Sequence, residues 1–390
     1  MTKNVAFIVN HFSERGTEVS TFNFAFYNKK ILGNKSIIIA FNKDVTEGKE
    51  SFINTSKSNF EAEFRILEID KIEEMKDIIK KENITHTYVQ SHGFHRDVYK
   101  FNKKEIWRGC QTIYHYVFGP MARQDSDIRC VIGEDLNIRF YKKIPVLPHI
   151  INKHTLVGDL RKELNINQRK IVIGRHGGLD TFDIEFVKKV IKQILSHRED
   201  IIFLFLNTNK FIEHTRVIHL PKTVSSAYKS RFINTCNCML HARKDGETFG
   251  LAVAEFSAAN KPIITYGKSK DNEHLRILND KAIIYNNEKE LYKILSNIEN
   301  NLNKNKDFNC YENFRPSIVI NKFDKICLQK KEKKLFPIEE FLLDLPWEFI
   351  IFLKIILKIM KTILLKLMPK KSKLFLKKLF KNSKVFKLLK

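Results

Sequence analysis

The chain has 390 residues, 43% of them hydrophobic and 29% charged, so it is long enough for two domains and apolar enough to bury a core in each. Six scattered cysteines lack the spacing of a zinc site and no secretory signal precedes them, which argues against a disulfide-built extracellular protein and favours a cytoplasmic one. The net charge of +25 predicts an anionic partner.

Apolar runs that predict strands alternate with amphipathic stretches that predict helices along the first part of the chain. Near-continuous apolar strands are typical of parallel sheets that helices cover on both faces. The pattern predicts a Rossmann-like domain over residues 1–155. Its expected strands lie at 4–10, 36–42, 63–69, 86–92 and 111–118, and its expected helices at 17–32 and 71–81.

The same alternation restarts after a pause near residues 150–168. It predicts a second Rossmann-like domain over residues 156–310, with a ligand cleft between the two domains. Residues 311–345 are expected to form a return helix and a linker. The expected strands of the second domain lie at 170–178, 200–207, 216–221, 238–243, 261–267 and 281–286, and its helices at 183–196, 225–233, after 246 and up to about 298.

The sequence GETFGLAVAE places two glutamates, Glu247 and Glu255, eight positions apart around an apolar run. We expect a strand to end near His241 or Ala242, the loop RKDG to follow it, and a helix to begin at Thr248 or Gly250. The unpaired N–H groups at that helix start favour an anion such as phosphate. Because the two acids lie at different depths and directions, we expect them to contact different parts of one long ligand.

This Glu-x7-Glu pattern resembles that of the retaining GT-B glycosyltransferases, in particular the glycosyltransferase family 4-like group. The resemblance extends over about residues 1–320 and is firmest from 170 to 286. It implies a GT-B fold, an α/β architecture of two facing doubly wound domains. It also implies that Glu247 contacts the donor sugar and that Glu255 hydrogen-bonds the nucleotide ribose. A carboxylate suits both tasks because it accepts hydrogen bonds from two hydroxyl groups.

The stretch GRHGG, residues 174–178, follows the first strand of the second domain, where the family has an arginine and a lysine that hold the diphosphate. Arg175 matches the arginine, but the next lysine along the chain is only Lys188. The alternative interpretation of this stretch is a simple turn with a helix cap. The other groups that we expect beside the donor are Gly177, Gly178, Arg243, Lys244, Thr248, Phe249 and Gly250.

On the acceptor side, Gly16 lies between the first strand and the first helix, where the family has a glycine-rich loop. The family also places a histidine near the transferred sugar. His115, in a predicted strand, matches best, and His92 is the second candidate; a packed or solvated histidine is the alternative for each.

A competing pattern, Asp125-Ser126-Asp127, resembles the metal-binding Asp-x-Asp of GT-A glycosyltransferases. GT-A enzymes have one mixed-sheet domain, whereas this chain predicts two βα series. We therefore expect no metal and no cofactor, with the nucleotide sugar as a substrate.

Residues 346–390 contain thirteen lysines and one acid, about half of the excess positive charge. Lys354, Lys358 and Lys361 form a narrow cationic stripe on an otherwise apolar helix, which predicts a helix that lies on an anionic membrane surface rather than crossing it. A docking helix with a basic end is the alternative.

The sequence thus predicts a glycosyltransferase that is peripheral on the inner face of the cell membrane and acts on a lipid-linked or cell-envelope glycan. The rival interpretations are a non-catalytic basic protein that binds membrane or nucleic acid through its tail, and a sugar-nucleotide binder without activity. No recognisable nucleic-acid motif supports a specific nucleic-acid partner.

Overall fold

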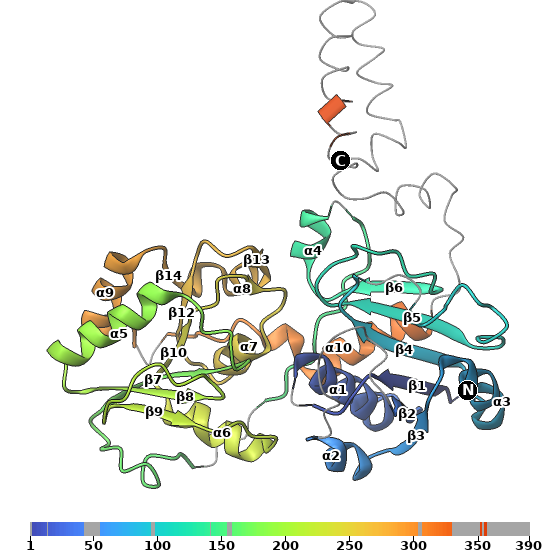
Figure 1. Cartoon of the computed structure of the whole chain (residues 1–390), viewed down its shortest axis with the longest axis horizontal. Helices are drawn as coiled ribbons and strands as arrows, with labels where there is room; N and C mark the ends of the chain where they lie inside the picture. The colour runs from blue at the N-terminus through green and yellow to red at the C-terminus, as the bar shows by residue number, and fades with distance from the viewer. Residues whose placement is uncertain are drawn as a thin grey trace, which may run out of the picture.

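The computed structural model describes residues 2–13, 15–42, 55–94, 98–140, 142–153, 158–302 and 306–329, together with 352, 355 and 356. Two six-stranded sheets form two domains that lie side by side (Figure 1). Apart from those three positions, the predicted tail at 346–390 lies outside the described residues. Among the residues that are described, no helix is long and apolar enough to cross a membrane.

The first domain is a parallel sheet in the order β3-β2-β1-β4-β5-β6. Its central strands are buried on both faces, as their continuous apolar sequences predict. The strands are β1 (Asn4–Val9), β2 (Lys35–Phe41), β3 (Arg65–Ile69), β4 (His86–Ser91), β5 (Gln111–Tyr116) and β6 (Ile128–Val131). The helices are α1 (Gly16–Lys30), α2 (Lys57–Glu61), α3 (Met75–Glu82) and α4 (Glu134–Arg139).

The second domain repeats this topology in the order β14-β12-β10-β7-β8-β9, again all parallel. The strands are β7 (Ile171–His176), β8 (Ile201–Leu206), β9 (Val217–Leu220), β10 (Cys238–His241), β12 (Ile263–Tyr266) and β14 (Ile283–Tyr285). The helices are α5 (Glu185–His197), α6 (Ser226–Thr235), α7 (Leu251–Ala258), α8 (Glu273–Leu278) and α9 (Glu288–Ser296). Two short strands, β11 (Gly246–Glu247) and β13 (Asp271–Asn272), pair beside this sheet.

The predicted architecture of two doubly wound domains is confirmed. The sequence did not predict β6, α4, α8 or the β11–β13 pair, because each has only two to six residues and too few turns or alternations to show a period. In each sheet the strand order reverses beside the first strand of the domain, between β1 and β4 and between β7 and β10. Ligands of open α/β sheets bind at this reversal, at the carboxyl ends of the strands.

After the second domain the chain returns to the first, where α10 (Pro316–Phe323) lies beside α1 (Figure 1). A further helical turn, Asp324–Leu328, follows directly. The fully buried ring of Phe323 packs against Phe7, Phe24 and Tyr88, with ring centroids 5.4 to 6.3 Å apart. Helix α10 is therefore part of the core of the first domain.

The two domains also touch at α4 and α8. The carboxylate of Glu273 accepts the backbone N–H of Asp135 at 2.7 Å, and the carboxylate of Asp135 accepts the N–H of Asn272 at 3.3 Å. Arg139 pairs with Asp271 beside them. A Cβ atom on Gly133 would lie 2.7 Å from the Glu273 carboxylate, so only glycine allows this close approach.

We expect Phe323→Ala to lower the free energy of unfolding by about 3–5 kcal/mol, because it removes a buried ring and leaves a cavity between two elements far apart in sequence. Urea unfolding followed by circular dichroism measures the change. Ile318→Ala on the exposed side of the same helix is the matched control and should cost less than about 1 kcal/mol. Equal effects of the two substitutions would contradict the packing of α10 in the first domain.

Candidate functional site

Three polar side chains lie at the carboxyl ends of the two strands between which the strand order of the second sheet reverses. Arg175 and His176 are the last residues of β7, and His241 is the last residue of β10. These two strands are direct neighbours, so their carboxyl ends lie together. The segment that follows β10 carries Glu247 in β11 and then Glu255 in α7.

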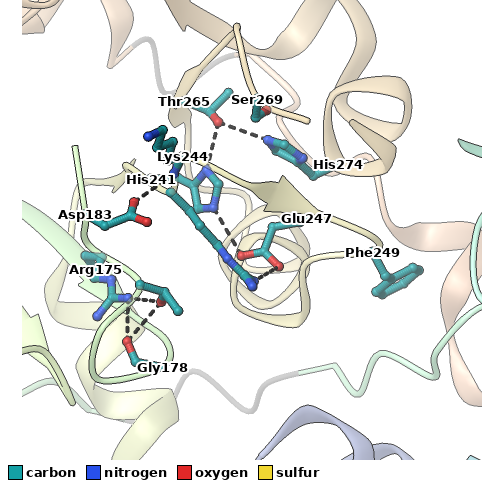
Figure 2. Close-up of polar contacts among 12 residues, drawn as sticks. Arg175, Gly178, Asp183, His241, Lys244, Glu247, Phe249, Thr265, Ser269 and His274 are labelled. Atoms are coloured by element: carbon teal, nitrogen blue, oxygen red, sulfur yellow. Dashed lines mark hydrogen bonds and ion pairs between the residues drawn. The ribbon is translucent and has the colours of Figure 1, made fainter. Parts of the chain in front are cut away.

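Both carboxylate oxygens of Glu247 have partners (Figure 2). Oε2 pairs with Nη1 of Arg243 at 2.9 Å, and Oε1 lies 3.3 Å from Nε2 of His241. Burial raises the pKa of Glu247, but the hydrogen bond with His241 and the positive charge of Arg243 outweigh it and lower the pKa from 4.5 to about 2. The carboxylate is ionised at neutral pH, and 20% of the side chain remains exposed to a ligand.

Two glycines shape the backbone around Glu247. Gly246 has a φ of 74°, and a Cβ atom there would lie 2.1 Å from the backbone oxygen of Asp271 in the paired strand. Gly250 has a φ of 84° and is the residue before the first turn of α7, which begins at Leu251. The chain therefore turns sharply at Gly250 and directs the first N–H groups of α7 away from the strand.

Glu255 lies in α7 and is paired with residues of two other elements. Its Oε1 lies 2.6 Å from Nζ of Lys229 in α6, and its Oε2 lies 2.9 Å from Nε2 of His176. Burial lowers the pKa of His176, although the hydrogen bond with Glu255 partly opposes that effect. The side chain of Glu255 is 13% exposed.

Arg175 has its guanidinium group turned into the protein rather than toward open solvent. Nη1 donates to the backbone oxygen of Asn207 at 3.1 Å and to Thr208 Oγ1, and Nη2 donates to Gly178 O at 2.9 Å and to Thr181 Oγ1 at 2.6 Å. Burial, opposed by the charge of Glu247, lowers the pKa of Arg175 to about 10. Arg175 thus fastens the loop after β7 to the loop after β8.

The other predicted donor residues occupy different positions. Lys244 is exposed, and its backbone N–H donates to Asp183 at 2.7 Å (Figure 2). Thr248 and Phe249 are buried, and the ring of Phe249 packs against His149 of the first domain with centroids 5.0 Å apart. Lys188 pairs with Glu185 on α5. Of the candidate phosphate cations, Arg243 and Lys244 are therefore the nearest to Glu247 along the chain.

Gly177 and Gly178 form the loop that Arg175 holds. Asn207 donates to the backbone oxygen of Gly177 at 2.7 Å. Gly16, the first residue of α1, lies opposite the second domain, and a Cβ atom on it would approach Leu251 Cδ1 to 3.3 Å. The structure thus brings the predicted glycine of the first domain next to the start of α7.

His115 and His92 lie in different surroundings. His115 is fully buried in the first domain, with its Nδ1 2.6 Å from the hydroxyl of Tyr88, and burial holds its pKa well below the ordinary range. His115 thus has no exposed surface, and its role beside the transferred sugar stays a prediction. His92 is exposed at the end of β4, where its ring stacks on Phe118 with centroids 5.3 Å apart.

The competing Asp-x-Asp pattern is part of other contacts. Asp125 pairs with Arg123 at 3.3 Å, while Asp127 accepts hydrogen bonds from the N–H and the hydroxyl of Thr112, both at 2.8 Å. Within the described ranges, no group of three His, Cys, Asp or Glu residues has the arrangement of a metal site.

The sequence did not predict three residues that pair with the two glutamates: His176, Lys229 and His241. His176 and His241 end neighbouring strands at the reversal of strand order, and that position is the signal that could have identified them. Lys229 gave no such signal because it lies on α6, one helix earlier in the chain than Glu255.

Comparison with known proteins identifies the fold. No family model and no curated protein matches the chain. Among solved structures, a glycosyltransferase from Rickettsia africae aligns with a TM-score of 0.65 at 13% identity, over 85% of this chain and all of the other. Anabaena HepE in complex with UDP-glucose aligns with a TM-score of 0.63 at 11% identity, over 83% of this chain and 98% of the other.

WaaG, a glycosyltransferase involved in lipopolysaccharide biosynthesis, aligns with a TM-score of 0.56 at 11% identity, over 83% of this chain and 99% of the other. The two parallel sheets and their helices match these two-domain proteins along almost their whole length. The predicted GT-B fold is therefore confirmed.

The contacts of Glu247 predict a pH-dependent contribution to stability. Its folded pKa lies below the ordinary value, so the contribution is complete above about pH 4.5 and is lost as the pH falls toward 2. We expect Glu247→Gln to lower the free energy of unfolding at pH 7 by up to about 3 kcal/mol, and by less at pH 4. Urea unfolding at the two pH values measures the difference.

Glu105→Gln, at an exposed position of the first domain, is the control for loss of one negative charge. A cost of Glu247→Gln that is the same at pH 4 and pH 7 would contradict the lowered pKa of Glu247.

Proposed function

We propose that this protein is a retaining, metal-independent glycosyltransferase. It moves a sugar from a nucleoside diphosphate sugar to a hydroxyl group of a lipid-linked or cell-envelope glycan at the cytoplasmic face of the membrane. The observation that carries the proposal is the pair of partly accessible carboxylates, Glu247 and Glu255, at the reversal of strand order in the second domain. Structural neighbours with this fold include a protein solved with UDP-glucose.

The two glutamates bind different parts of the donor. Glu255 accepts hydrogen bonds from the ribose hydroxyls, and Glu247 accepts them from hydroxyls of the transferred sugar. The diphosphate lies between, beside the N-terminus of α7 and the side chains of Arg243 and Lys244. Arg175 holds the loop after β7 that borders this position.

In the reaction, the bond between the anomeric carbon and the diphosphate oxygen breaks, and a bond from the anomeric carbon to the acceptor oxygen forms on the same face. The proton of the acceptor hydroxyl passes to the leaving diphosphate. Cations and helix N–H groups lower the barrier by neutralising the charge that develops on the diphosphate. His92, exposed at the edge of the first domain, is the remaining acceptor-side candidate.

We propose a cell-envelope glycan as the acceptor. This proposal is supported by the predicted cationic stripe in residues 346–390, which suits a membrane-bound acceptor, and by the likeness to WaaG.

A thermal-shift panel of UDP-, GDP-, ADP- and CMP-sugars with EDTA present tests the donor class. We expect one nucleotide to raise Tm by about 5 °C when its concentration is a hundred times its Kd. Glu255→Gln should abolish this shift, whereas Glu185→Gln on the exposed face of α5 should leave it unchanged. If only anionic vesicles or RNA shift Tm, the non-catalytic basic protein is the correct alternative. A shift that requires Mg²⁺ would contradict metal independence.

The two glutamates should differ in which part of the donor they affect. We expect Glu255→Gln to weaken binding of the free nucleoside diphosphate and of the sugar nucleotide alike. Glu247→Gln should leave binding of the free nucleoside diphosphate unchanged but lower kcat for sugar release at least about 100-fold, because it contacts only the sugar. Calorimetric titration measures the binding of the nucleoside diphosphate and of the sugar nucleotide, and a nucleotide-release assay measures kcat. Equal loss of nucleoside diphosphate binding in the two variants would contradict the division of roles.

A further inference from the structure

A buried chain of hydrogen bonds ends on Glu247 (Figure 2). Nε2 of His274 lies 3.2 Å from Oγ1 of Thr265, Oγ1 of Thr265 lies 2.9 Å from Nδ1 of His241, and Nε2 of His241 lies 3.3 Å from Oε1 of Glu247. The chain joins four segments of the second domain, α8, β12, β10 and β11. Register places His241 directly beside Thr265 on neighbouring parallel strands.

These three side chains are shielded from water. Thr265 and His274 are fully buried, and His241 is 5% exposed. The rings of His241 and His274 lie edge to face with centroids 4.9 Å apart. Since a buried polar group must find its hydrogen bonds within the protein, the direction of each bond in the chain is constrained.

The direction follows from the last acceptor. Glu247 is ionised and can only accept, so Nε2 of His241 carries the proton that it donates. When Nε2 carries the one ring proton, Nδ1 of His241 accepts from the hydroxyl of Thr265, and Thr265 accepts in turn from Nε2 of His274. Burial lowers the pKa of His274 to about 3, so that ring is neutral.

Glu247 therefore has one partly exposed partner, Arg243, and one buried partner, His241. Arg243 is 25% exposed on its side chain and is a candidate cation for the diphosphate. If a donor draws Arg243 toward phosphate, the ion pair with Glu247 weakens. His241 cannot move toward the phosphate with Arg243, because the hydrogen bond with Thr265 and the surrounding side chains hold its ring.

We propose that His241 is a positioning residue that keeps the Glu247 carboxylate aimed at the donor sugar, and that the hydrogen bond between Thr265 and Nδ1 holds the His241 ring in place. The inference rests on the proposed function of Glu247. None of the three residues touches the substrate; His241 acts through Glu247.

Four variants test this role in a nucleotide-release assay, with the sugar nucleotide that the thermal-shift panel selects. We expect His241→Ala to lower kcat about 10- to 100-fold with little change in KM, because one hydrogen bond to a charged group is lost. His241→Gln should recover most of kcat, since its amide N–H lies close to the position of Nε2. Thr265→Val should lower kcat about as much as His241→Ala does. Thr265→Ser should keep the kcat of wild type.

His197→Gln, at an exposed position on α5, is the control for a histidine-to-glutamine change and should leave kcat and Tm unchanged. Each variant is first checked for the Tm shift with the free nucleoside diphosphate, which shows that it is folded. If wild type releases nucleotide and His241→Ala matches it in kcat, the positioning role is overturned while the glycosyltransferase stands. If wild type releases nucleotide from no sugar nucleotide, the proposed function itself fails.

A spectroscopic test needs no ligand. In the wild-type protein labelled with ¹⁵N-histidine, we expect long-range ¹H–¹⁵N spectra at pH 8 to show the Nε2–H tautomer for His241, assigned by its loss in His241→Gln. Thr265→Val should leave the proton on Nε2, because Glu247 still accepts it. An Nδ1–H tautomer of His241 in wild type would overturn the proposed direction of the chain.

Discussion

The reversal of strand order in the second sheet is the constraint on which the candidate site depends. β7 and β10 are neighbours, yet the chain leaves them toward opposite edges of the sheet, so their connecting loops diverge. Ligands of open α/β sheets bind at such a divergence, at the carboxyl ends of the two strands, and α7 begins at Leu251, ten residues after the end of β10. Arg175, His176 and His241 reach the site only because they are the last residues of these strands.

The site shows why a strongly basic chain retains two acids in its cleft. Each carboxylate is compensated by one cation and one histidine, Glu247 by Arg243 and His241 and Glu255 by Lys229 and His176. A partly buried carboxylate without such partners would be protonated or would destabilise the fold. A sugar nucleotide brings both hydroxyl donors for the carboxylates and a diphosphate for the cations. Under the proposed function, a bound sugar nucleotide would exchange partners within the site without leaving a buried charge unpaired.

The sequence predicted the two sheets, because their strands are long apolar runs, and it predicted the segment from Glu247 to Glu255. It could not predict which way side chains face within a strand that is buried on both sides, since such strands show no alternation. For this reason His115 was expected in the cleft but lies among Tyr88 and Phe24. The partners of Arg175 were also hidden, because Asn207 and Thr208 follow another strand more than thirty residues along the chain.

Contacts with the first domain add a second constraint on the glutamates. Phe249 lies between Glu247 and α7, and it packs on His149 of the first domain and on Phe314 of the returning chain. Asn272, which pairs with Glu247 as part of β13, donates its N–H to Asp135. Glu247 is thus flanked on both sides by residues anchored to the first domain. The printed partners of Glu255, His176 and Lys229, belong to the second domain, so a change in the angle between the domains would act more directly on Glu247 than on these contacts.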